Sequence, residues 1–122
     1  MGQEYPARLL RIHISEGDRF QGKPLYEAIV TKCRELKIAG ATVFRGLEGY
    51  GESAEMHRSH LSRHDQPILI SIVDSAENLG RLVPVVEEML EDGLIVISDA
   101  EIVRLVRGSK TTEAADATGL PS

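Results

Sequence analysis

Apolar residues recur at every second position in two segments of the chain, as they do on the buried face of a β-strand. Residues 7–15 read ARLLRIHIS, and the apolar residues on one side of this segment are Leu10, Ile12 and Ile14. Residues 68–74 read ILISIVD directly after Pro67, and the apolar side carries Ile68, Ile70 and Ile72. Both segments are therefore predicted to be strands that face the same core.

Two other segments have the spacing of three to four residues that is typical of amphipathic helices. The first opens with Lys23 and Pro24, and its aligned residues are Leu25, Ile29, Lys32 and Leu36. The second follows a capping signal at residues 74–77 (DSAE), and its apolar residues are Leu79, Leu82, Val83, Val86, Met89 and Leu90. Pro84 lies inside the second pattern, so we expect a kink there or a helix that begins closer to it.

Two further strands complete the predicted order. Residues 41–47 (ATVFRGL) are rich in β-forming residues. Residues 94–107 (LIVISDAEIVRLVR) predict a short extended piece, a turn at Ser98 and Asp99, and a last strand. The order β-α-β-β-α-β predicts an α+β ferredoxin-like sandwich, with a four-stranded antiparallel sheet and both helices on one face.

The sheet face that the helices leave free is also expected to be apolar. We assign to it Leu9, Leu69, Val73, Val103 and Leu105. An antiparallel sheet with one face exposed to solvent normally carries polar residues on that face. Burial is favourable by about 25 cal/mol per Å² of apolar surface, so we expect a homo-oligomer that covers this face.

Composition narrows the classes of partner. The chain has 122 residues, with 42% hydrophobic and 27% charged, which predicts one domain over residues 1–107 and a mobile polar tail over 108–122. A single cysteine, Cys33, excludes an internal disulfide and indicates a reducing, cytoplasmic location. The net charge of −5 argues against general nucleic-acid binding, and no segment suits membrane insertion or a secretory signal.

Residues 44–60 (FRGLEGYGESAEMHRSH) hold the candidate chemistry. Their glycines can expose N–H groups to an anion, or can simply turn the chain out of a strand into a long loop. Basic residues could hold a phosphate if they converge at a subunit boundary, or could form surface ion pairs with the abundant glutamates. These residues are Arg45, Arg58, Arg63, Arg104, Arg107 and Lys110.

Three histidines, His57, His60 and His64, would lie roughly on one face of a helix. They could bind zinc or nickel, or they could be solvated loop residues or anion contacts. A metal-responsive binding protein is therefore the alternative function. No nucleophile lies beside an identifiable base, so we expect no enzymatic activity and no obligatory cofactor.

Four stretches carry a resemblance to a known family: GKPLYEAIV, GATVFRGLEGYG with the downstream His57, LISIVDS, and EDGLIVISDAEIVRLVR. Over about residues 7–107 the chain resembles the PII-like family of domains of unknown function, and it is more distantly similar to the PII signal-transduction proteins. The resemblance implies a homotrimer with adenine-nucleotide sites in clefts between subunits and loops that act on a target protein. The residues expected at the ligand site are Arg45, Gly46, Gly49, Tyr50, Gly51, His57, Gly93, Arg104 and Arg107.

The sequence departs from PII proteins at two places. The nucleotide-clamping loop of those proteins ends in a lysine, whereas residues 91–94 read EDGL. A lost charge-assisted contact costs about 1.5–3 kcal/mol, so AMP or ADP is expected in preference to ATP. Residues 52–66 contain no tyrosine, so control by modification of a loop tyrosine is not expected.

Overall fold

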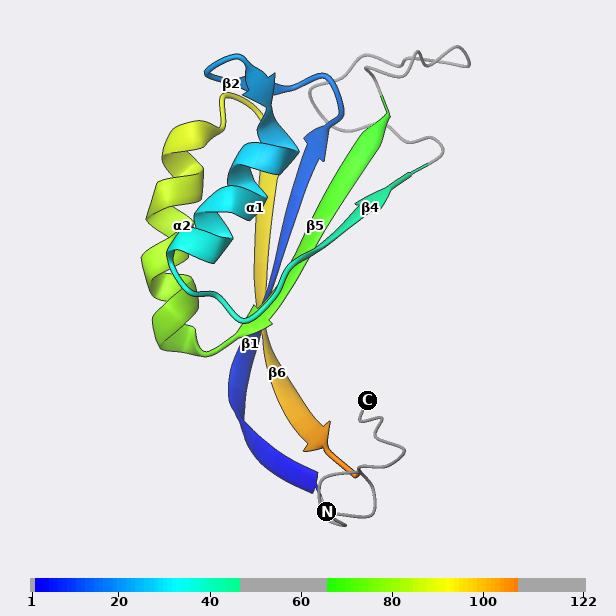
Figure 1. The fold of residues 1–122 in the computed structure, drawn as a ribbon, viewed down its shortest axis with the longest axis vertical. Helices are drawn as coiled ribbons and strands as arrows, with labels where there is room; N and C mark the ends of the chain where they lie inside the picture. Colours follow the sequence, from blue (N-terminus) through cyan, green and yellow to red (C-terminus); the bar gives the residue numbers. More distant parts are fainter. Residues whose placement is uncertain (1, 47–65, 108–122) are drawn as a thin grey trace, which may run out of the picture.

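The computed structural model of the chain describes residues 2–46 and 66–107, which form a four-stranded sheet with two helices on one face (Figure 1). The strand order is β4-β5-β1-β6, and every neighbouring pair is antiparallel. This arrangement confirms the predicted ferredoxin-like sandwich. The sheet strands are β1 (Gly2–Ser15), β4 (Thr42–Arg45), β5 (Pro67–Asp74) and β6 (Leu94–Leu105), and the helices are α1 (Leu25–Glu35) and α2 (Ala76–Met89).

The core lies between the sheet and the helices. The register of β1 and β5 pairs Leu10 with Ile72, Ile12 with Ile70 and Ile14 with Ile68, and all six side chains are buried. Because side chains alternate between the faces of a strand, the two apolar rows predicted from the sequence meet on the helix side.

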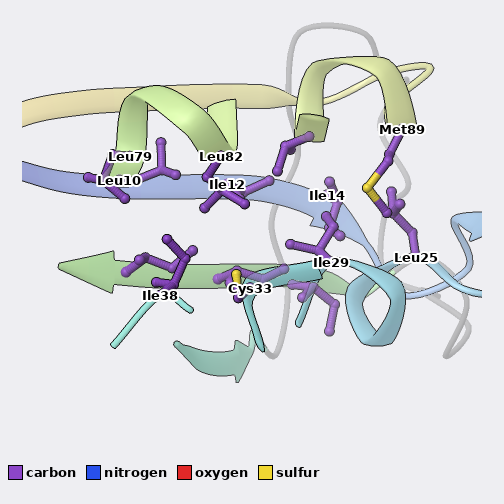
Figure 2. Close-up of a cluster of buried hydrophobic side chains, with 14 residues drawn as sticks. Leu10, Ile12, Ile14, Leu25, Ile29, Cys33, Ile38, Leu79, Leu82 and Met89 are labelled. Carbon is purple, nitrogen blue, oxygen red and sulfur yellow. The ribbon is translucent and has the colours of Figure 1, made fainter. Parts of the chain in front are cut away.

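Both helices bury one stripe against these rows, as the close-up of the core shows (Figure 2). Helix α1 contributes Leu25, Ile29 and Cys33, whereas the predicted Lys32 is only half-buried and pairs with Glu35. Burial raises the pKa of the Cys33 thiol to about 11. The buried residues of α2 are Leu79, Leu82, Val86 and Met89.

The predicted capping signal of α2 is confirmed. The Ser75 hydroxyl accepts a hydrogen bond from the Asn78 backbone N–H at 3.1 Å, which satisfies one of the free donors at the helix start. The helix continues through Pro84 to Met89 rather than starting near it. Pro84 has no N–H, so the carbonyl of Gly80 lacks its usual donor within the helix. Both residues are exposed, so water can donate that hydrogen bond instead.

The segment between β1 and α1 differs from the prediction. Two short strands, β2 (Arg19–Phe20) and β3 (Lys23–Pro24), form a hairpin, and α1 begins at Leu25 with Pro24 as its N-cap residue. The two connecting residues, Gln21 and Gly22, have positive φ angles of 52° and 81°. This backbone matches the tight two-residue turns that hairpins prefer.

Strand β6 corrects two predictions. It continues through Ser98 and Asp99 without a turn, because both residues pair with β1. Its unbroken register with β1 places Val103 and Leu105 on the same side as Ile95 and Ile97, so they do not belong to the opposite face to which we assigned them. Both are exposed because they lie on the part of the β1–β6 ribbon that extends beyond the helices (Figure 1).

Candidate functional site

One end of the sheet gathers three of the predicted site residues. Arg45 ends β4, Gly46 follows it, and Gly93 directly precedes β6. Arg45 pairs with Ile68 and His13 pairs with Leu94, so these residues lie at the same end of the sheet along the strand direction. We call this end the loop end (Figure 1). Residues 47–65 depart from this end, so it forms the base of the candidate site.

Arg45 forms a paired ion contact with Glu16, the residue that follows β1. Its Nε donates to Oε1 at 2.6 Å and its Nη2 donates to Oε2 at 2.8 Å. The Glu16 side chain is only 17% exposed and that of Arg45 is 42% exposed. The hydrogen bond to Glu16, and then its negative charge, raise the pKa of Arg45 above its usual value. The pair therefore ties the end of β4 to the end of β1.

Gly46 is required by close packing. Its N–H donates to the Pro67 carbonyl at 2.8 Å, which extends the β4–β5 pairing by one residue. A Cβ atom at this position would lie 2.8 Å from Cγ of the Pro67 ring, closer than real Cβ contacts allow. Glycine thus permits the close approach of Gly46 to Pro67 at the end of the β4–β5 pair.

Gly93 also packs closely against the end of β1. Its φ angle is +156°, and an added Cβ would lie 3.0 Å from the His13 carbonyl oxygen and 3.3 Å from Cγ2 of Ile14. The short connection from α2 to β6 therefore passes close to the β1 backbone, where a side chain would be crowded and its φ angle strained.

Arg104 and Arg107 lie at the opposite end of the molecule. Both are exposed, and they come at and just after the end of β6. Leu94 and Arg104 are separated by ten residues of continuous strand, so at about 3.3 Å per residue they are roughly 33 Å apart. A single subunit therefore does not bring these arginines together with Arg45, Gly46 and Gly93.

The remaining predicted site residues lie outside the described part of the chain: Gly49, Tyr50, Gly51, His57, His60 and His64. Within residues 2–46 and 66–107, no group of three or more His, Cys, Asp or Glu side chains is arranged to hold a metal ion. The metal-binding alternative rests on the histidine segment and stays untested.

Glu16 is the site residue that sequence reasoning missed. It lies in a turn-like segment (SEGDRFQG), where an acidic residue is common and carries no particular signal. Only the strand order reveals its role, because β5 lies between β1 and β4 and the ion pair reaches across its end.

The sheet face opposite the helices has no covering layer within the described chain. We call it the open face, and define it by three residues of β1, Leu9, Arg11 and His13, with the residues paired to them: Val73, Ser71, Leu69, Ser98, Val96 and Leu94. Phe44 and Thr42 extend it onto β4. Phe44 is 51% exposed and Leu94 is 57% exposed, so the predicted apolar character of this face is confirmed for Leu9, Leu69 and Val73 and extends to further residues.

The fold defines a ferredoxin-like α+β protein, and the chain was also compared with known protein families. The model of the DUF190 family, described as "Uncharacterized ACR", matches residues 7–102. The chain therefore belongs to the DUF190 family. Among the described residues, no helix is both long and apolar enough to cross a membrane.

Two relatives of the chain are both named UPF0166 proteins. A UPF0166 protein of Aquifex aeolicus is 35% identical over 100 residues, which cover 80% of this chain and 94% of the relative. A UPF0166 protein of Methanocaldococcus jannaschii is 37% identical over 101 residues, which cover 80% of this chain and 93% of the relative.

Among solved structures, the chain is similar to CPII of Thiomonas intermedia K12, a nitrogen regulatory PII-like protein. The structure of CPII bound to ADP and bicarbonate has a TM-score of 0.64 at 19% identity, and the match covers 84% of this chain and 93% of CPII. A second CPII structure holds ADP, AMP and bicarbonate, with a TM-score of 0.59 at 18% identity and a match that covers 82% and 98%. At this identity the likeness establishes the shared fold.

Proposed function

We propose that this chain is a non-enzymatic, PII-like sensor that binds an adenine nucleotide between the subunits of a homotrimer. Residues 47–65 would act on a partner protein when the nucleotide is bound or released. The observation that carries the proposal is the open face, an apolar surface that no part of the described chain covers, on a sheet that has basic residues at both ends. Burial of this face would stabilise the trimer, and the basic side chains would bind the phosphate groups of the nucleotide.

A trimer accounts for the distance between the two groups of predicted site residues. In a cyclic trimer each contact joins two different surfaces of neighbouring subunits. The far end of β6 in one subunit, with Arg104 and Arg107, can therefore lie against the loop end of the next subunit. The cleft would combine Arg45, Gly46 and Gly93 of one copy with both arginines of its neighbour.

The ligand proposed is AMP or ADP rather than ATP. CPII, which shares the fold, has been solved with ADP and with AMP, and this supports an adenine nucleotide. The connection from α2 to β6 is short and carries no lysine to hold a third phosphate. One charge-assisted contact fewer corresponds to about a tenfold loss of affinity or more.

Isothermal titration of the full chain with AMP, ADP and ATP tests the proposal. We expect saturable binding of AMP or ADP, and weaker binding of ATP by roughly tenfold. Arg104→Gln should weaken ADP binding by about tenfold, because it removes one charged phosphate contact. Arg34→Gln, which changes the same charge on the exposed side of α1, is the matched control and should leave the affinity unchanged.

Two results would contradict the proposal. The first is the absence of saturable binding of all three nucleotides up to millimolar concentration. The second is equal loss of affinity in the Arg104 and Arg34 variants, which would show a general charge effect instead of a site at the end of β6.

A further inference from the structure

A row of hydrogen-bond donors crosses the middle of the open face. Ser71 of β5 is paired with Thr42 of β4 on one side and with Arg11 of β1 on the other. Residues paired in this way point to the same face, so two hydroxyl groups and one guanidinium group follow one another across three strands. The guanidinium carries several N–H donors and no acceptor, and each hydroxyl can donate as well.

Apolar residues flank this donor row on both sides. Phe44, Leu69 and Leu94 lie on the side toward the loop end, and Leu9 and Val73 lie on the other side. When another copy of the chain covers the open face, these residues exclude water around the donors. The donor row then lies inside the proposed interface, away from solvent.

The open face offers Arg11 no carboxylate. Within the described strands, from residue 6 onward, the charged or titratable residues on this side of the sheet are Arg11 and His13 of the open face and Arg104 beyond it, and none is Asp or Glu. The chain nevertheless contains 19 acidic residues. By contrast, Arg8 on the helix side of the sheet pairs with Asp99 at 3.2 Å. Enclosing an arginine without an anionic partner is strongly unfavourable.

We propose that the assembled trimer holds a small multivalent oxyanion on its threefold axis, bound by Arg11 and Ser71 of each subunit. The proposal rests on the trimer of the proposed function. When three sheet faces close around an axis, the middle of each face lies nearest to that axis, and β5 and β1 are the two middle strands. Three guanidinium groups and three hydroxyls then converge on one anion, as in charge-assisted recognition of phosphate or sulfate. This axial site is separate from the nucleotide clefts at the ends of the sheet.

Sedimentation of the nucleotide-free full chain in sulfate and in chloride, at equal ionic strength, tests the axial site. We expect sulfate to lower the concentration at which the trimer dissociates by about tenfold, as one strong anion contact would. Arg11→Gln should remove this difference and should leave a trimer that is at least as stable in chloride as the wild type. Arg34→Gln, with the same change of charge on α1, should keep the full response to sulfate. The affinity of Arg11→Gln for ADP should equal that of the wild type.

Each other outcome overturns the axial site in a recognisable way. A wild-type trimer with no preference for sulfate, or an equal preference in Arg11→Gln, means that anions act elsewhere. A variant that dissociates in both salts means that Arg11 pairs with a group of the neighbouring subunit, such as an acidic residue of 108–122. A wild-type monomer in every buffer overturns the proposed trimer together with the axial site, whereas the former results leave the trimer intact.

Discussion

Gly46 is the residue at which one added methyl group should disturb the base of the proposed nucleotide site. A Cβ there would lie 2.8 Å from the rigid Pro67 ring, so β4 and β5 must shift apart. We expect Gly46→Ala to lower the free energy of unfolding by about 1–3 kcal/mol, the usual cost of overpacking, as measured by urea denaturation.

Gly40→Ala is the matched control, because a Cβ at Gly40 meets nothing within 4 Å. Its effect should stay within about 0.5 kcal/mol, as for surface substitutions in general. Equal stability of the two variants would show that the close approach of Gly46 to Pro67 does not constrain the sheet.

Asp74 should make the fold sensitive to acid. Partial burial raises the pKa of its carboxyl. Hydrogen bonds from the N–H groups of Ala39 and Ser75 and from the Asn78 side chain, together with the charge of Arg81, lower the pKa by a larger amount, so the net shift is downward. A lowered pKa means that the carboxylate stabilises the fold above its ordinary pKa of 3.8, and that this contribution is lost as the pH falls through the folded-state value.

The measurement is urea unfolding of the wild type and Asp74→Asn across pH 7 to 2. The variant should be less stable by about 1 kcal/mol at pH 7, and the difference should shrink below pH 3.8. A difference that stays constant over this range would mean that the charge of Asp74 contributes nothing.

Single residues of the site were only partly predictable. The pattern of a strand followed by glycines indicated Arg45 and Gly46, and the family resemblance added Gly93; their part in ligand binding stays a prediction. The sequence could not indicate that Arg45 is paired with Glu16, because that contact depends on two segments separated by 29 residues. It also could not show that Gly46 is needed for packing against Pro67, which is a property of the β4–β5 register.

At the scale of elements, strong periodic patterns were reliable and polar interruptions were misleading. The isoleucines of β1 and β5 gave the buried face correctly, because alternation is imposed by the strand itself. Ser98 and Asp99 resembled a turn, yet they continue β6 because pairing with Leu9 and Arg8 holds them extended. The β2–β3 hairpin was missed, since its strands have only two residues each and show no periodicity.

Helix α2 offers a direct test of local helix stability. Gly80 lies in its interior, is exposed, and leaves open space where a Cβ would be. Gly80→Ala should therefore raise the free energy of unfolding by about 0.5–1 kcal/mol, because alanine loses less backbone entropy in a helix.

Thermal unfolding followed by circular dichroism gives the readout. Ser75→Ala, which removes the N-cap hydrogen bond to Asn78, is the opposing control and should lower stability by about 1 kcal/mol. Loss of stability in Gly80→Ala would indicate that the glycine is needed where Pro84 interrupts the backbone hydrogen bonds.

For the whole molecule, the open face links the fold to the proposed function. An apolar sheet face that no described part of the chain covers predicts association with another copy, and Leu9, Leu69 and Val73 already indicated such a face in the sequence. The placement of the arginines was not predictable, because the length of β6 puts Arg104 and Arg107 far from the loop end. A nucleotide site built from all of these residues therefore requires more than one subunit.

Native mass spectrometry of the full chain, with and without ADP, tests this account most directly. The account predicts a particle of three times the 13.4 kDa subunit mass that takes up at most three ADP molecules. A particle of one subunit mass at micromolar concentration, with no ADP retained, would contradict it.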